Sequence, residues 1–192
     1  MEASGVRKQR LASLAVLFVS LTAAACQGGQ TAGDAGPLPT EIHGMELVEV
    51  QSGPDASGVL EHMHASGAAP AADNYVGHYG TEEMGAVVYL SRFATADEAS
   101  EQRVTMSQGL DRGDGGFGHT IRFRAGSRWV QITFGQGRVH YFWDDDVDLV
   151  WLTLNDAAVA RPVLAEMLGT TADSIPTFEE LISGRPVEER GT

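Results

Sequence analysis

The sequence contains little that could cross-link the chain or carry familiar catalytic chemistry. Cys26 is the only cysteine among 192 residues, so no intrachain disulfide is possible and the fold must rely on its core. The motifs G-x-S-x-G and H-E-x-x-H are absent, and so is a glycine-rich phosphate loop with a lysine. These absences remove the commonest signatures of a serine hydrolase, a zinc protease and a nucleotide-binding enzyme.

Positive charge is scarce, and Lys8 is the only lysine. The chain has 13 basic and 26 acidic residues; without residues 1–25 these numbers become 10 and 25, a net charge of −15. Such a surface repels nucleic acids and anionic lipid headgroups, so we expect no nucleic-acid partner. Solubility alone accounts for the acidity, although proteins adapted to high salt have a similar composition.

The longest apolar run, residues 11–23, is shorter than the roughly 20 residues that a membrane-spanning helix needs. A positive segment with Arg7, Lys8 and Arg10 precedes it, and small residues follow it directly before Cys26. A positive segment, an apolar segment and a small-residue cleavage site, in this order, are typical of a secretory signal peptide.

The residues Ala23-Ala24-Ala25-Cys26 resemble the lipobox of bacterial lipoproteins, although Ala23 stands where that family usually has leucine. The resemblance implies cleavage before Cys26, lipidation of its thiol and amino group, and an exported protein anchored in the cell envelope. More than one acyl chain gives stable anchoring. Gln27, in place of aspartate, favours the outer membrane in a cell with two membranes. The alternative is a secreted protein with a free Cys26, which leaves that cysteine unexplained.

Composition divides the chain into four parts. Residues 1–25 form the expected signal peptide. Residues 26–41 are rich in Gly, Ala, Thr and Pro and predict a flexible tether. Residues 42–184 alternate apolar patterns with turn residues and predict a single globular domain. Residues 185–192 are polar and predict a disordered tail.

The stretch 119–154 predicts the sheet around which the domain is organised. Its apolar residues recur with a period of two, which is the signature of a strand with one buried face. Turn residues interrupt the pattern at 126–127, 135–137 and 144–146, so we expect a four-stranded antiparallel meander. The last strand, 147–154, is apolar at both parities, which predicts cover on both faces.

Earlier strands are expected at 45–51, 74–79 and 86–93. A helix follows the first strand, a turn joins the second to the third, and another helix follows the third. Thr95 with Glu98, and Thr177 with Glu180, have the spacing of a capping box at a helix start. Gly109 predicts the end of the first of these helices. Pro162 predicts a kink or a late start in the helix over 159–167.

These patterns together predict an α+β domain with an antiparallel sheet and its helices packed largely on one face. The order strand, helix, strand, strand, helix, strand also allows a ferredoxin-like split βαβ beginning.

The glycine-rich segment 110–118 is open to several interpretations. Gly113, Gly115 and Gly118 match G-x-G-x-x-G, but a helix precedes them and a strand follows, the reverse of the dinucleotide-binding order. Asp111 and Asp114 could offer oxygen ligands to calcium, yet the alternating carboxylates of an EF-hand loop are missing. We therefore expect a flexible connection into the meander.

Candidate site residues fall in the meander. Trp129, Phe142 and Trp151 could share a face as an aromatic patch for a partner or ligand, with His140 beside them as an acid–base group. The carboxylates at 144–148 could bind calcium, or form a solvated turn. Histidines and methionines near one another in sequence allow a copper-type metal site: His43, Met45, His62, Met63, His64, His78, Met84, His119 and His140.

No family pattern is evident over residues 42–184, so function must be inferred from the address and the fold class. We expect a lipid-anchored, non-catalytic envelope domain that binds a protein partner or a small ligand and uses no cofactor. One alternative is a periplasmic metal-binding protein using histidines, and the other is an envelope hydrolase without a recognisable motif.

Overall fold

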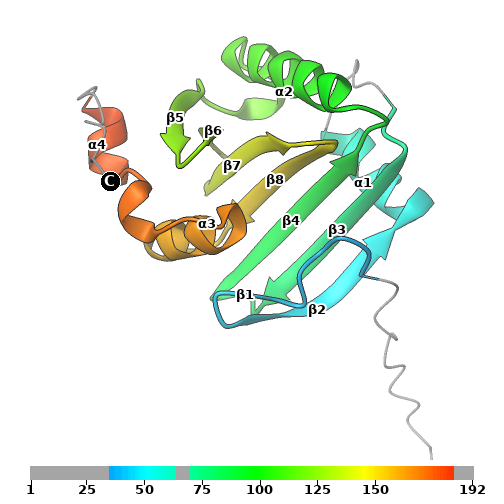
Figure 1. The fold of residues 1–192 in the computed structure, drawn as a ribbon, viewed down its shortest axis with the longest axis horizontal. Coiled ribbons are helices and arrows are strands. Elements are labelled where there is room, and N and C mark those ends of the chain that lie inside the picture. Colours follow the sequence, from blue (N-terminus) through cyan, green and yellow to red (C-terminus); the bar gives the residue numbers. More distant parts are fainter. Residues whose placement is uncertain (1–34, 64–69, 184–192) are drawn as a thin grey trace, which may run out of the picture.

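A computed structural model describes residues 35–63 and 70–183 of the chain. They form one eight-stranded antiparallel sheet in the order β1-β2-β3-β4-β8-β7-β6-β5 (Figure 1). The strands are β1 (Glu41–Ile42), β2 (Met45–Ser52), β3 (Asp73–Gly80), β4 (Gly85–Arg92), β5 (Ile121–Ala125), β6 (Arg128–Gly135), β7 (Arg138–Asp145) and β8 (Asp148–Leu154). The helices are α1 (Gly53–Met63), α2 (Ala96–Asp111), α3 (Ala160–Leu168) and α4 (Phe178–Ile182), with short 3₁₀ turns η1 (Asp114–Gly116), η2 (Ala157–Val159) and η3 (Ala172–Ser174).

The predicted α+β class and the C-terminal meander are confirmed. Strands β5, β6, β7 and β8 are joined by tight turns and pair in sequence order. Two turns fall within the predicted breaks, but the third lies at Asp146–Val147, whereas Asp144 and Asp145 remain in β7. Both of these carboxylates form ion pairs with arginines, which accounts for their place in the strand.

The ferredoxin-like beginning is wrong. A split βαβ unit needs two parallel strands with a third between them, but β3 lies antiparallel and directly beside β2. The end of β2 at Ser52 pairs with Tyr75 near the start of β3. The connection through α1 therefore returns the chain at the same end of the sheet, where only an antiparallel neighbour can form. Strand β5 lies at the far edge, seven places from β1.

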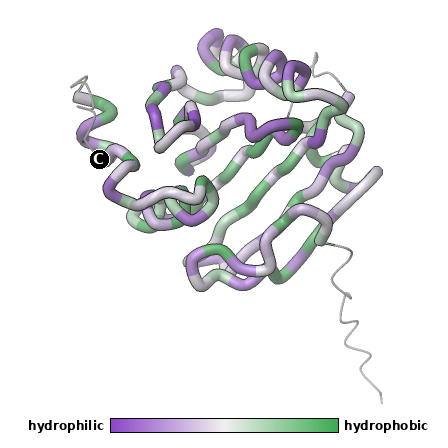
Figure 2. The backbone as a smooth tube through the Cα atoms, viewed as in Figure 1, coloured by the Kyte–Doolittle hydropathy of each residue, from purple (hydrophilic) through white to green (hydrophobic). Residues whose placement is uncertain are grey.

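The helices pack on both faces of the sheet, not largely on one as the sequence predicted (Figure 1). Helix α3 packs in the larger apolar cluster, and α2 packs in a smaller cluster on the opposite side. The physical reason lies in β7 and β8, whose central residues are buried at both parities. We call the two sides of the sheet the α3 face and the α2 face. In Figure 2, much of the central strands that lie between α2 and α3 has the green colour of hydrophobic residues.

The α3 face is a filled apolar core. Its centre is formed by Val88, Leu152, Tyr141 and Ile132, which lie across from one another on four neighbouring strands. Leu164 of α3 covers them and is fully buried. Alternating apolar residues from successive strands thus bury one continuous surface, the main contribution to folding.

Local sequence signals set most helix ends. The Thr95 hydroxyl accepts a hydrogen bond from the Glu98 amide, and Thr177 forms a complete capping box with Glu180. Helix α3 starts at Ala160, so Pro162 lies in its first turn, as predicted. Helix α2, however, continues past Gly109 to Asp111. Burial of Leu110 offsets the modest cost of a helical glycine.

The packed structure begins earlier than the expected boundary at Ile42. Leu38 is only 4 % exposed and belongs to the core of the α3 face. Residues 35–41, which the sequence assigned to the tether, are therefore part of the fold. No helix within the described ranges is long and apolar enough to cross a membrane. The signal peptide, Cys26 and the predicted tail 185–192 lie outside those ranges.

Candidate ligand pocket on the α2 face

Buried polar side chains gather on the α2 face. Five of these residues lie on strands, at positions that alternate with the apolar residues of the α3 face. The sixth, Gln102, lies on α2. The complete set in the described residues is Ser91, Gln102, Gln131, Thr133, His140 and Thr153. Polar groups are costly to bury unless they are hydrogen-bonded, so their concentration on one face shows where the fold keeps a specific arrangement.

Part of this set ties α2 to the sheet. Gln131 donates a hydrogen bond to the Ser107 hydroxyl at 2.6 Å and accepts one from Arg103 at 3.1 Å. Arg103 also forms an ion pair with Asp144 at 2.6 Å. Two residues of α2 are thereby linked to one residue of β6 and one of β7 through hydrogen bonds and an ion pair. The position of α2 over this half of the sheet follows from these contacts.

His140 lies at the centre of the second half of the set, only 3 % exposed. Its Nε2 is 3.0 Å from the Gly135 carbonyl oxygen, and its Nδ1 is 3.0 Å from the Thr153 hydroxyl. The indole Nε1 of Trp151 donates to His140 Nδ1 and to Thr153 Oγ1, both at 3.2 Å. A carbonyl can only accept and an indole N–H can only donate, so His140 is neutral with its proton on Nε2.

The surroundings of His140 keep it uncharged. Burial lowers the pKa of His140 below its ordinary value, the hydrogen bond to Gly135 opposes this, and the charge of Arg138 lowers the pKa further. A neutral imidazole with both nitrogens engaged inside the protein has no free site for a proton from a substrate. In this arrangement His140 orients Trp151.

Aromatic rings surround His140. The Trp151 ring stacks on Phe142, with centroids 5.2 Å apart and planes at 12°. The Phe117 ring meets His140 and Trp151 edge-on, with centroids 5.0 and 5.5 Å away. Such arrangements match the preferred geometries of aromatic pairs. Trp151 is therefore held on three sides and presents its remaining surface in one orientation.

The glycine-rich segment delivers Phe117 to this cluster. Gly113, Gly115 and Gly116 all adopt positive φ, a backbone that other residues rarely adopt. Phe117 then forms an isolated bridge with Gly135 of β6. A Cβ on Gly135 would lie 2.2 Å from the Phe117 ring, so only glycine permits this approach. The segment predicted as a flexible connection thus places one aromatic side chain against the sheet.

A pocket of about 630 Å³ opens beside this cluster, on the part of the α2 face next to α1. Its size lies within the range typical of small-molecule sites. Its lining comes from α1 (Asp55, Gly58, Val59), the glycine-rich segment (Gly115, Phe117), the sheet (Tyr89, His140, Trp151, Thr153) and the β6–β7 turn region (Gln136, Arg138).

Helix α1 forms one wall of the pocket and is held to the sheet by hydrogen bonds. Asn74 of β3 donates to the Ser57 hydroxyl at 3.0 Å and accepts from Ser91 of β4 at 2.8 Å. Ala56 and Leu60 of α1 are buried. The pocket therefore lies between two anchored elements, and its walls are largely preformed.

Two opposite charges lie at the pocket, and both are exposed. They are Asp55, in the first turn of α1, and Arg138, at the start of β7. The field of Arg138 reaches the pocket floor, since it lowers the pKa of His140 and opposes the rise that burial causes in the pKa of Tyr89. An aromatic floor with a few polar groups at the mouth is the usual composition of a ligand site.

The structure brings together three of the four residues that the sequence singled out. His140, Phe142 and Trp151 lie in one cluster, but all are buried and form no exposed patch. Trp129 is 39 % exposed and packs with Arg122 and Arg124 of β5, whose guanidinium carbons lie 3.9 and 4.9 Å from its ring. His140 and Trp151 line the pocket, and Phe142 supports Trp151 from behind.

Sequence reasoning missed the other pocket residues, above all Phe117, Tyr89 and Arg138. The only signal for Phe117 is a single aromatic residue within a run of glycines. Tyr89 and Arg138 occupy ordinary strand positions, and only strand pairing shows that Tyr89 lies beside Trp151. Their role depends on partners that are distant in sequence.

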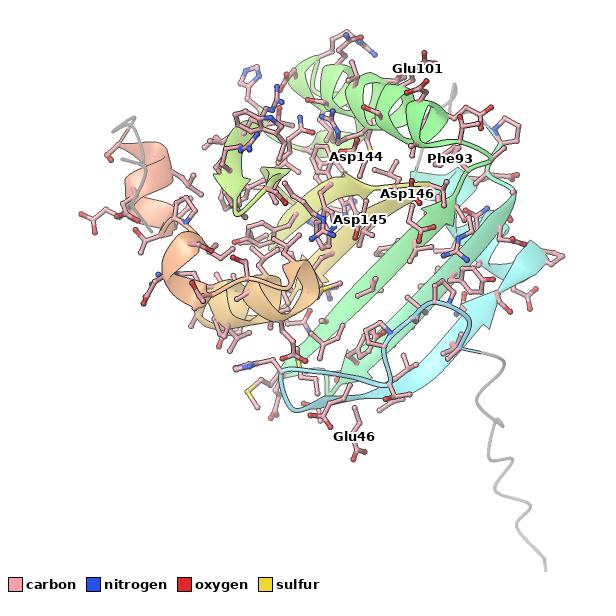
Figure 3. The ribbon with its side chains drawn as sticks, in the orientation of Figure 1. Glu46, Phe93, Glu101, Asp144, Asp145 and Asp146 are labelled. Carbon is pink, nitrogen blue, oxygen red and sulfur yellow. The ribbon has the colours of Figure 1, made fainter. Side chains whose placement is uncertain are left out.

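Of the three carboxylates labelled at the end of β7 and its turn in Figure 3, Asp144 and Asp145 form ion pairs with arginines. Asp145 binds Arg128 with oxygen–nitrogen distances of 2.8–3.1 Å, and Asp148 binds Arg92 through two hydrogen bonds of 2.8 Å. Among the described residues, no three His, Cys, Asp or Glu side chains are placed to hold a metal ion. His64 and the side chain of His62 lie outside that part of the chain.

Comparison with protein-family models, with curated proteins and with solved structures finds no match for this chain. The functional argument is therefore carried by the geometry of the α2 face.

Proposed function

We propose that this protein is a lipid-anchored, non-catalytic domain of the cell envelope that binds a small organic ligand in the pocket of the α2 face. The observation that carries the proposal is the preformed pocket itself, with Tyr89, Phe117 and Trp151 in its walls and polar groups at its mouth. A globular core has no need of such a space, since apolar interiors are close-packed.

The hydrogen bonds of His140 support binding over catalysis. The pocket contains His140 and also a carboxylate, Asp55, which is the combination that a hydrolase would use. Both His140 nitrogens are nevertheless engaged by Gly135, Thr153 and Trp151. A general base needs a free nitrogen within reach of the substrate, so the arrangement favours a ring that holds the pocket floor in place.

The anchor on Cys26 would keep the domain near the membrane. Ala35, the first described residue, is nine positions after Cys26, and an extended chain of that length spans roughly 30 Å. The pocket would then sample the layer directly next to the bilayer. A ligand that partitions there, or is delivered there, would meet the domain at a high local concentration.

Native and denaturing mass spectrometry of the protein from its own membranes tests both parts of the proposal. Loss of residues 1–25 with acyl mass on Cys26 is expected, and a bare Cys26 would contradict the anchor. Additional mass of a small organic molecule, seen only in the native spectrum, is expected from the pocket. A metal ion in its place would favour the metal-binding alternative.

The same experiment on Gly58→Trp assigns the bound mass to the pocket. Gly58 lines the pocket, its φ is not in the left-handed region, and a Cβ there meets no atom within 4 Å. A large side chain at this position can therefore enter the open space without backbone strain. Loss of the ligand in this variant is expected, while ligand retention by a folded Gly58→Trp protein would contradict the pocket as its site.

A further inference from the structure

We infer that the pocket selects an organic anion with a flat apolar body, held by an ion pair with Arg138 and by contact with the Trp151 and Phe117 rings. This inference rests on the proposed function and adds the chemical class of the ligand and the residue that recognises its charge. Three observations carry it: the pairing state of the arginines, the shape of the pocket floor, and the charge of the protein.

Arg138 differs from every other arginine of residues 35–63 and 70–183. The others have a carboxylate, an aromatic ring or another bonding partner. The side chain of Arg138 alone has no hydrogen bond, ion pair or ring contact within those residues, although it lines the pocket. Carboxylates outnumber cations two to one in this protein, so an arginine without one is available for an external anion.

The pocket floor complements a flat apolar body. The Trp151 ring is fixed by Phe142 on one side and by its bonds to His140 and Thr153. The Phe117 ring stands nearly perpendicular to it, at 76°. A planar group can therefore contact the Trp151 ring and the Phe117 ring at the same time, without the cost of ordering either side chain first.

The acidic surface makes a specific cation necessary for an anionic ligand. A net charge of −15 on the mature chain repels anions at long range, and Asp55 adds repulsion at the pocket itself. A guanidinium that forms paired hydrogen bonds with a carboxylate, sulfonate or phosphate overcomes this at contact distance. Arg138 should therefore strengthen the binding of an anion, and Asp55 should weaken it.

Two fluorescent probes with the same ring system test the inference. 8-Anilinonaphthalene-1-sulfonate carries a negative charge, and N-phenyl-1-naphthylamine is its neutral counterpart. Both are titrated into the mature chain, residues 26–192 with Cys26→Ser, followed by probe emission and by quenching of tryptophan fluorescence. The variants are Arg138→Gln, Asp55→Asn and Gly58→Trp, with Arg124→Gln as a control that removes one positive charge on the same face, outside the pocket.

The expected result is a charge-selective change. Arg138→Gln should weaken the anionic probe about tenfold and the neutral probe less than about twofold, and Asp55→Asn should tighten the anionic probe about two- to threefold. Arg124→Gln should change neither probe by more than about twofold. Added salt should change the affinity of the anionic probe only, because screening acts on its ion pair with Arg138 and on the repulsion from the acidic surface.

Other outcomes separate this inference from the proposed function. If Arg138→Gln affects both probes equally, or neither, while Gly58→Trp abolishes both, the pocket binds ligands but does not select an anion. If neither probe binds, or if Gly58→Trp leaves binding unchanged, the pocket proposal itself is overturned. Gly58→Met provides a second blocking variant, and thermal unfolding of each variant identifies any that fails to fold.

Discussion

The α3 face and the α2 face are formed by alternate residues of the same strands, yet they are built differently. On the α3 face the buried side chains are apolar and α3 packs against them. On the α2 face apolar residues share the surface with hydrogen-bonded polar groups such as His140 and Gln131. Helix α2 covers only part of that face, and the pocket occupies the space beside α1.

This difference separates stability from recognition. A close-packed apolar layer contributes most of the folding free energy, because burial of apolar area is the main favourable term. A layer with directional hydrogen bonds contributes less per residue but holds side chains in defined orientations. The α3 face can therefore keep the sheet folded while the α2 face maintains an opening, and substitutions on the two faces should have different effects.

Replacing one buried leucine by alanine on each face should give the largest loss in the free energy of unfolding and the clearest difference between the faces. Leu152→Ala, at a fully buried position of the α3 face, should lower the free energy of unfolding by about 4 kcal/mol. Leu149→Ala, 5 % exposed near the start of β8 on the α2 face, should cost about 2 kcal/mol. Urea unfolding followed by circular dichroism measures both, and equal losses would contradict the difference between the faces.

Breaking the hydrogen bonds of His140 should cost less but affect the pocket more. His140→Leu leaves the Gly135 carbonyl without its partner, while Trp151 keeps only its bond to Thr153. The expected loss in unfolding free energy is about 2 kcal/mol, the usual cost of a buried group left unpaired. Probe binding should fall in parallel because Trp151 is less well oriented. Tyr79→Phe, which removes a hydrogen bond to the Pro39 carbonyl on the α3 face, should destabilise the fold but leave binding unchanged.

Acidification should weaken the α2 face through His140. Since the folded-state pKa of His140 is lowered from its ordinary value of 6.5, protonation favours the unfolded chain. The stability that the neutral ring provides is thus complete above about pH 6.5 and is lost as the pH falls towards the folded-state pKa. The wild-type urea midpoint should fall more between pH 7.5 and pH 5 than that of His140→Gln. Identical falls would show that the other titrating groups account for the whole effect.

Gly58→Ala should give the smallest effect, and with the opposite sign. Its Cβ enters open space beside the pocket, and alanine has a higher helix propensity than glycine by roughly 0.5–1 kcal/mol. The unfolding free energy should increase by about that amount, and urea unfolding measures it. Gly85→Ala serves as the counterpart, because a Cβ there would lie 2.3 Å from the Thr81 carbonyl oxygen, and it should destabilise the protein strongly.

Much of the fold could be predicted because its signals are local. The alternation in 119–154 depends on neighbouring residues only, and β5 to β8 follow it closely. Capping at Thr95 and Thr177 requires partners three residues away. The predictions that were wrong concern elements far apart in sequence: the pairing of β2 with β3, the distribution of helices over two faces, and the packing of residues 35–41.

The pocket was beyond prediction for the same reason. The sequence placed His140, Phe142 and Trp151 together because strand alternation puts them on one face, but it could not show that they are covered. Phe117 reaches them only because Gly135 leaves room for its ring, a match between two residues 18 positions apart. The availability of Arg138 became visible only when the partners of the other arginines were known.

The sequence by itself determined most of the secondary structure and the acidic composition, because each depends on composition or on neighbours within one turn or strand. Only the tertiary structure decided which face α2 and α3 cover, which polar groups are buried, and where space remains. Those outcomes depend on how separate elements share limited volume and satisfy one another's hydrogen bonds. The pocket beside α1, with Arg138 at its mouth, exists only because of this tertiary packing.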